Sequence, residues 1–151
     1  MIFILDLGLG NCASLKNAFI KIGHNCIVTD GVDSLNIATH IILPGVGSFD
    51  EFMTRLHEQD RLYDSLMKRI IQDKVPTLGI CLGMQVLMES SAEGTQAGLG
   101  IVPGHVRKFV GSNNIRVPHT GWKSIRRANN KHSYQDLFLS LIHISEPTRR
   151  Y

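Results

Sequence analysis

Short apolar runs alternate with helix-forming segments from the N-terminus to Glu89, and no other feature of the sequence constrains the fold as strongly. Periodicity and turn residues predict strands at Ile2–Leu5, Asn25–Thr29, Thr39–Leu43 and Thr77–Ile80. Helices are predicted after Ser14 and over Phe49–Leu56, Leu62–Asp73 and Leu82–Glu89. This α/β order predicts an open, mostly parallel sheet with helices on both faces.

Residue spacing also assigns the buried face of two helices. The first helix is expected to be capped by Ser14 and to end at Gly23. Its inward residues are expected to be Leu15, Ala18, Phe19 and Ile22. In the helix over residues 62–73 they are expected to be Leu62, Leu66, Ile70 and Ile71. Ser34–Ile37 is expected to be a poor helix or a loop, and further short strands are expected at Gly104–Val110 and Ile115–Pro118.

Composition excludes several classes of protein. The 151 residues are 43% hydrophobic and 19% charged, which suits one domain with its own core. The net charge of +3 is dispersed, and the basic stretch Lys123–Arg127 lacks interleaved aromatics, so no nucleic-acid partner is expected. Three widely spaced cysteines favour neither a disulfide framework nor a zinc site. No apolar run approaches the roughly 20 residues of a membrane span, and a cytoplasmic location is expected.

Cys81 stands where a strand meets a helix, between Gly79 and Gly83. This spacing is typical of a nucleophile elbow, with cysteine in place of serine. Glycines suit a sharp turn whose neighbours approach closely, and the helix start favours the thiolate. The alternative is a buried structural cysteine at the end of a core strand, but the two glycines favour a nucleophile.

A second glycine-rich loop, Pro44–Ser48, is expected at the same edge of the sheet, since the carboxyl ends of parallel strands meet there. Its backbone amides could form an oxyanion hole for acyl transfer. Alone, the loop could equally be a phosphate cradle or a plain turn. A phosphate loop would carry a lysine after its glycines, and none follows Ser48.

Several motifs together resemble the class I (triad) glutamine amidotransferases, and among them the glutaminase subunits of imidazole glycerol phosphate synthases in histidine biosynthesis. The resemblance covers residues 1–139. The segment Gly79–Gln85 indicates the superfamily, and the segments Pro44–Phe49 and Pro118–Trp122 indicate this subunit within it. It implies a flavodoxin-like amidotransferase fold.

The resemblance also implies roles for individual residues. Cys81 would form a glutamyl thioester from glutamine, and Gln85 and Glu93 would bind that substrate. The oxyanion would be held by backbone amides of Gly45, Val46, Gly47 and Leu82. Ammonia would pass to a (β/α)8-barrel cyclase subunit in a heterodimer, with Asn11, His119 and Trp122 at the interface. No cofactor and no metal ion are implied.

The histidine and glutamate of the family's triad come from a His-Pro-Glu segment, and none of the seven histidines stands in one. In His143-Ile-Ser-Glu146 the two side chains are three residues apart and would point to opposite faces of a strand. Residues 140–151 resemble the translation of a sequencing adapter and are expected to be non-native. Residues 1–139 are therefore expected to form an incomplete amidotransferase domain, and the chain as written to be inactive.

Two other interpretations stay open. The chain could be a paralogous amidotransferase subunit that supplies ammonia for surface-sugar amidation, because its motifs would overlap almost entirely. It could also be a non-catalytic module that keeps the fold without a triad. The identity of the neighbouring genes would distinguish the paralogous subunit from the histidine-pathway subunit. A His-Pro-Glu strand after Leu139 would exclude the non-catalytic module.

Overall fold

The computed structural model describes residues 1–111, 117, 120–123 and 142–145, and for 120–123 and 142–145 it describes the backbone alone. The chain divides into two compact units, Met1–Lys108 and Phe109–Tyr151. The boundary expected between residues 139 and 140 lies outside the described residues and stays a prediction.

A four-stranded sheet forms the centre of the first unit. Its strands lie in the order β2-β1-β3-β4, with β1 at Ile2–Leu5, β2 at Cys26–Thr29, β3 at His40–Leu43 and β4 at Thr77–Gly79. Each of the three pairings is parallel, and the register places Ile2 beside both Cys26 and His40. The predicted open parallel sheet is confirmed.

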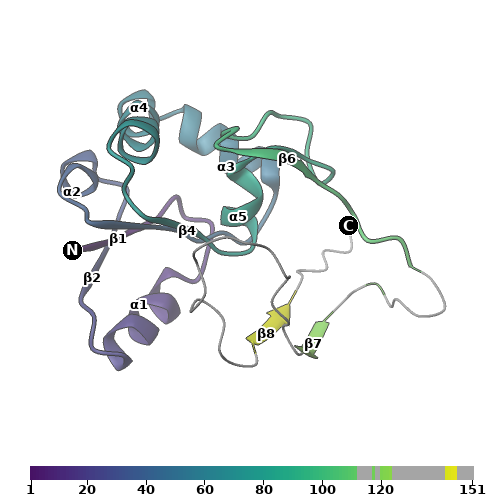
Figure 1. Ribbon diagram of the computed structural model, residues 1–151, viewed down its shortest axis with the longest axis horizontal. Coiled ribbons are helices and arrows are strands. Elements are labelled where there is room, and N and C mark those ends of the chain that lie inside the picture. Colours follow the sequence, from purple (N-terminus) through teal and green to yellow (C-terminus); the bar gives the residue numbers. More distant parts are fainter. Residues whose placement is uncertain (112–116, 118–119, 124–141, 146–151) are drawn as a thin grey trace, which may run out of the picture. The chain divides into compact units, whose positions relative to one another are not determined.

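Helices cover both faces of this sheet, as predicted, because successive residues of each strand point to opposite sides. On one face α1 (Cys12–Lys21) packs through its Cys12, Leu15 and Phe19 on Ile4, Cys26 and Ile42. The other face carries α2 (Val32–Asn36), α3 (Phe49–His57), α4 (Asp60–Met67) and α5 (Leu82–Val86). Figure 1 shows α1 below the sheet and the other four helices above it. Each large side chain buried here contributes about 1.5–3 kcal/mol to stability.

Helix α1 begins one turn earlier than predicted. Asn11 rather than Ser14 is its cap, because the Asn11 Oδ1 accepts the Ser14 N–H at 3.1 Å. The helix face that packs on the sheet therefore carries Cys12, Leu15 and Phe19, at spacings i, i+3 and i+7. The prediction that Ala18 and Ile22 also lie inward is wrong, since both are exposed. Gly23 follows the helix end with φ +84, as a glycine after a C-cap does.

Two further helices differ from their predictions. Val32–Asn36 forms a short helix, where a poor helix or a loop was expected. The predicted helix over residues 62–73 is split into α4 and a π-helical turn, η1 (Lys68–Gln72). Leu62 and Leu66 are buried as expected, but Ile71 is exposed, because the wider π turn changes which side chains face the core.

Helix α5 is shorter than predicted, and Met88–Ser91 forms strand β5 instead of continuing it. Strand β5 pairs in parallel with β6 (Val102–Val106). Backbone hydrogen bonds from Leu99 to Val86 and from Gly98 to Glu89 hold the chain in this path. Pairing between distant segments therefore overrides a run of good helix formers.

The second unit contains an antiparallel pair, β7 (Thr120–Lys123) with β8 (Ile142–Ser145). Strand β8 lies within the segment 140–151, for which no strand was expected. The predicted strand Ile115–Pro118 and its preceding turn fall almost wholly outside the described residues. Among the helices that the structure describes, none is long and apolar enough to cross a membrane.

Candidate functional site

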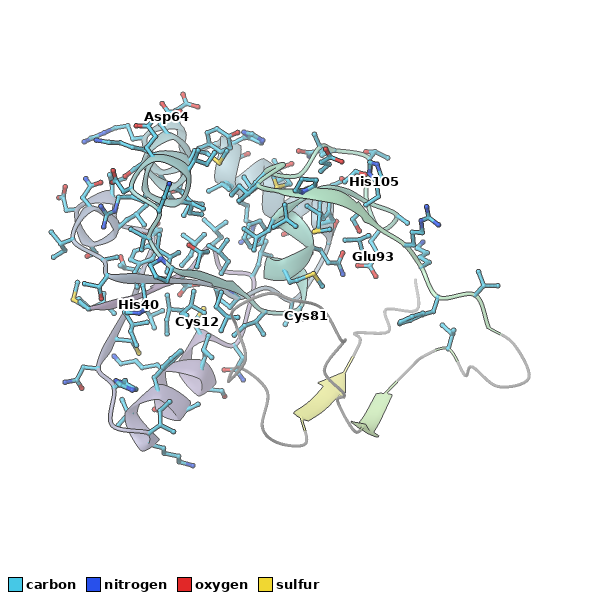
Figure 2. The ribbon with its side chains drawn as sticks, in the orientation of Figure 1. Cys12, His40, Asp64, Cys81, Glu93 and His105 are labelled. Carbon is cyan, nitrogen blue, oxygen red and sulfur yellow. The ribbon has the colours of Figure 1, made fainter. Side chains whose placement is uncertain are left out.

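Cys81 occupies the corner between β4 and α5, where the glycine spacing places it. Its backbone has φ 55° and ψ −114°, outside the regions that side-chain-bearing residues normally adopt. Such strain costs about 1–3 kcal/mol and concentrates at functional sites. The side chain is half-buried, and Figure 2 shows it at the end of β4. The corner has the geometry of a nucleophile elbow.

The glycines beside Cys81 are required by close backbone contacts. A Cβ on Gly83 would lie 1.7 Å from the carbonyl oxygen of Leu43, the last residue of β3. A Cβ on Gly79 would lie 2.6 Å from the Gly83 carbonyl oxygen. A side chain at Gly83 would collide with the end of β3, and a side chain at Gly79 would collide with α5. These close contacts are the reason for which the sequence predicts glycine at both positions.

The Pro44–Ser48 loop packs directly on this corner. A Cβ on Gly45 would lie only 2.9 Å from the Leu82 Cβ. Leu82 is the first residue of α5, and an N–H in a first helical turn has no acceptor within its helix. The two backbone segments from which an oxyanion hole is predicted are thus neighbours at the carboxyl end of the sheet.

One amide of this loop is turned away from such a role. The Val46 N–H donates to the Leu9 carbonyl oxygen at 3.1 Å. A single N–H cannot bind Leu9 and an oxyanion beside Cys81 at the same time. Gly47, with φ +138°, follows directly and gives the loop backbone the freedom to rearrange.

Gln85 and Glu93, predicted to bind substrate, contact each other. The Gln85 Nε2 donates to the Glu93 Oε2 at 3.2 Å. Ser91, which sequence reasoning gave no role, joins them: its Oγ donates to the Gln85 Oε1 at 2.8 Å and accepts the Glu93 N–H at 3.1 Å. Gln85 and Ser91 are only 6% and 5% exposed, so this polar network is fixed in place next to the cysteine corner. Gln85 lies one helical turn after Cys81, and its N–H donates to the Cys81 carbonyl.

The other two cysteines have a different setting. Cys12 and Cys26 are buried in the core between α1 and the sheet. Burial, and then the charge and hydrogen bond of Asp6, raise the pKa of the Cys12 thiol to about 11. Cys12 is therefore a thiol at neutral pH. Among the described side chains, no three His, Cys, Asp or Glu residues gather in a way that could hold a metal ion.

The predicted interface residues are only partly described. Asn11 is exposed and caps α1. His119 lies outside the described residues, and of Trp122 the structure gives only the backbone, in β7. Three histidine side chains have partners away from the cysteine corner: His40 with Thr39, His57 with Tyr63, and His105 with Ser90.

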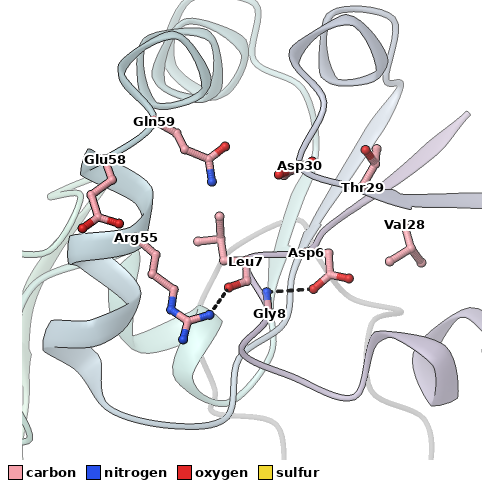
Figure 3. A pocket seen from close by; sticks show the side chains of 9 residues that line it. All are labelled: Asp6, Leu7, Gly8, Val28, Thr29, Asp30, Arg55, Glu58 and Gln59. Carbon is pink, nitrogen blue, oxygen red and sulfur yellow. Dashed lines mark hydrogen bonds between the residues drawn. The ribbon is translucent and has the colours of Figure 1, made fainter.

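A hollow of about 700 Å³ opens at the carboxyl ends of β1 and β2 (Figure 3). Asp6, Thr29, Asp30 and Glu58 give it polar walls, and the Arg55 Nη1 donates to the Leu7 carbonyl at 2.8 Å. None of the cysteine-corner residues lines it, and β3 separates β1 from β4 in the sheet. Backbone strain and a buried polar network coincide at the Cys81 corner and not in this hollow, so the Cys81 corner is the candidate functional site.

Comparison with known proteins agrees with this geometry. The family model described as glutamine amidotransferase class-I matches residues 3–143. A solved structure described as a crystal structure of glutamine amidotransferase superposes with a TM-score of 0.66 at 20% sequence identity, over 81% of this chain and 62% of that one. At this identity the likeness concerns the fold alone.

Closer relatives are found among curated proteins. The imidazole glycerol phosphate synthase subunit HisH 2 of Methanococcus maripaludis is 48% identical over 126 residues, which are 83% of this chain and 62% of that protein. The subunit HisH of Bdellovibrio bacteriovorus is 46% identical over 129 residues, 83% of this chain and 63% of that protein. The chain thus spans somewhat more than three fifths of the length of these relatives.

Proposed function

The chain belongs to the class-I glutamine amidotransferase family, and from this premise we propose that it is the glutaminase subunit of an imidazole glycerol phosphate synthase. The observation that carries the proposal is the strained Cys81 corner, packed against the Pro44–Ser48 loop and followed by the Gln85–Glu93 pair. The relatives with 48% and 46% identity carry that subunit's name, which favours histidine biosynthesis over a paralogous pathway.

The proposed reaction is acyl transfer. The Cys81 thiol gives its proton to the histidine of the family's triad, and the resulting thiolate attacks the side-chain carbonyl carbon of glutamine. The C–N bond then breaks as the leaving nitrogen takes up that proton, which gives a glutamyl thioester and ammonia. Water hydrolyses the thioester to glutamate and returns the thiol. Amides of Gly45–Gly47 and Leu82 hold the oxyanion of each tetrahedral intermediate. Gln85 and the Glu93 carboxylate bind the substrate's α-ammonium group.

The proposed partner is a (β/α)8-barrel cyclase subunit, in a cytoplasmic heterodimer. Ammonia passes directly between the subunits, because a dry path keeps it unprotonated and nucleophilic. Asn11, His119 and Trp122 are proposed to lie at this interface. The complete reaction further requires the histidine and glutamate of the family's triad.

Covalent labelling tests the proposal. The protein for this test is an extended chain, in which residues 1–139 are joined to the C-terminal part of the Methanococcus maripaludis relative. A glutamine analogue with an electrophilic diazoketone should label Cys81 and spare Cys12 and Cys26, since these are buried and the pKa of Cys12 is about 11. Peptide mass spectrometry locates the adduct. A urea-denatured sample, in which all three thiols react with iodoacetamide, is the control, and equal labelling of the three in the folded chain would refute the proposal.

The Val46 contact leads to a prediction about the partner. While the Val46 N–H is bound to Leu9, the oxyanion lacks one donor, and losing one donor typically costs about 10²–10³ in rate. The extended chain alone should therefore hydrolyse glutamine about 10²–10³ times more slowly than its complex with the cyclase subunit. Glutamate release, measured with and without the partner, gives the ratio. Equal turnover in both samples would show that this amide does not limit the isolated subunit.

A further inference from the structure

We propose that Asp50 is a positioning residue for glutamine binding, which fixes the Glu93 loop to the start of α3 and so sets the place of the Glu93 carboxylate. This inference rests on the proposed function, because it concerns how the same site recognises glutamine. Asp50 lies in the first turn of α3, and its partners are 45 and 46 residues further along the chain.

The Asp50 carboxylate binds the loop through several donors. Its Oδ1 accepts the N–H groups of Thr95 at 2.8 Å and of Gln96 at 2.9 Å. Its Oδ2 accepts the Thr95 hydroxyl at 3.0 Å. The Gln96 side chain adds two bonds, from its Nε2 to the Asp50 carbonyl at 3.1 Å and to the Thr54 Oγ1 at 2.7 Å. Hydrogen bonds to an ionised acceptor are about twice as strong as neutral ones, so the loop is firmly held.

Gly94 brings the loop into contact with the helix. A Cβ at this position would lie 2.4 Å from the Asp50 Oδ1 and 2.7 Å from the Phe49 ring. Glu93 directly precedes Gly94, and its own N–H and carboxylate are bound by Ser91 and Gln85. Glu93 is therefore held from both sides: by the network next to Cys81 and by Asp50.

The charge of Asp50 suits this role. The Gln96 N–H, followed by the Thr95 N–H and hydroxyl, holds the pKa of the Asp50 carboxyl below its usual value. The carboxylate is thus ionised throughout the neutral range, and the anchor would be lost only as the pH falls through that lowered pKa. The neighbouring Glu51 also lies in the first turn, but its carboxylate binds only Arg55 among the described residues, so helix-dipole complementarity alone does not account for the Asp50 contacts.

The test compares two electrophiles on the extended chain. Asp50→Asn keeps the shape of the side chain but removes its charge and turns an N–H₂ group toward the loop donors. We expect the KI of the diazoketone glutamine analogue for Cys81 to rise about tenfold, as when one charge-assisted hydrogen bond to a ligand is lost. The rate with iodoacetamide, which needs no ammonium recognition, should not change. Glu51→Gln is the matched control, since it removes one charge from the same helical turn, and it should leave both values unchanged.

A second comparison tests whether Asp50 acts through Glu93. In a Glu93→Gln background, Asp50→Asn should add little, because the group that it positions is already gone. Thr95→Val removes one donor and should shift KI in the same direction by a smaller factor, which keeps the proposal testable if Asp50→Asn folds poorly. An unchanged KI, an equal change with both electrophiles, or full additivity with Glu93→Gln would overturn the role of Asp50. Failure of the extended chain with its native Asp50 and Glu93 to react with the analogue at Cys81 would overturn the proposed function instead.

Discussion

The 151-residue chain made as written is expected to hydrolyse glutamine up to about 10⁶-fold more slowly than the extended chain. Cys81 keeps its strained corner, but the chain offers no histidine in a His-Pro-Glu segment to take the thiol proton and return one to the leaving ammonia. Removing the base from such a unit leaves only the residual catalysis of the oxyanion hole and binding. Glutamate release by the two chains, each with the cyclase subunit, measures the ratio. Equal turnover would show that a histidine already present, with His143 as the first candidate, is the base.

The 151-residue chain is also expected to be less soluble than the extended chain. Strand β4 is at one edge of the described sheet, and its Leu78, which pairs with the buried Ile42, is 49% exposed. An apolar edge strand is a site of aggregation. The extended chain should therefore stay monodisperse to a higher concentration in light scattering. A matched variant, Leu78→Thr in the 151-residue chain, should recover part of that difference if the exposed edge is its cause.

Much of the fold could be predicted because its signals are local. The strands around Ile4 and Ile42 are short apolar runs bounded by turn residues, and the structure places them within a residue of the predicted limits. Helix α5 could not be predicted correctly, because nothing after Gly83 interrupts a helical pattern. It ends because the carbonyls of residues 86–89 accept backbone N–H groups from residues 98–102.

The candidate site could likewise be predicted only in part, where the sequence signals are local. Cys81 could be found because a strained corner needs glycines at fixed spacing on either side. The Pro44–Ser48 loop could be placed beside it because parallel strands end at the same edge. Asp50 could not be found, since its partners lie about 45 residues away and an acidic residue in a first helical turn has an ordinary explanation.

Replacing the nucleophile should separate the two halves of the proposed reaction. In the extended chain, Cys81→Ala removes the sulfur atom that forms the proposed thioester, so glutamine-dependent synthesis by the complex with the cyclase should fall to background. The cyclase needs only ammonia, and synthesis from added ammonium salt should therefore persist. Cys12→Ala is a control for the loss of a thiol elsewhere, because Cys12 is buried in the core and has no part in the proposed chemistry.

The most direct measurement is the rate of product formation by the wild-type, Cys81→Ala and Cys12→Ala complexes, each with glutamine and with ammonium as the nitrogen source. We expect Cys81→Ala to lose synthesis from glutamine, to match the wild type with ammonium, and to bind the cyclase normally. Cys12→Ala should use both sources in the wild-type ratio. Glutamine-dependent synthesis by Cys81→Ala at a rate near that of the wild type would contradict the assignment of Cys81 as the nucleophile, and with it the proposed glutaminase.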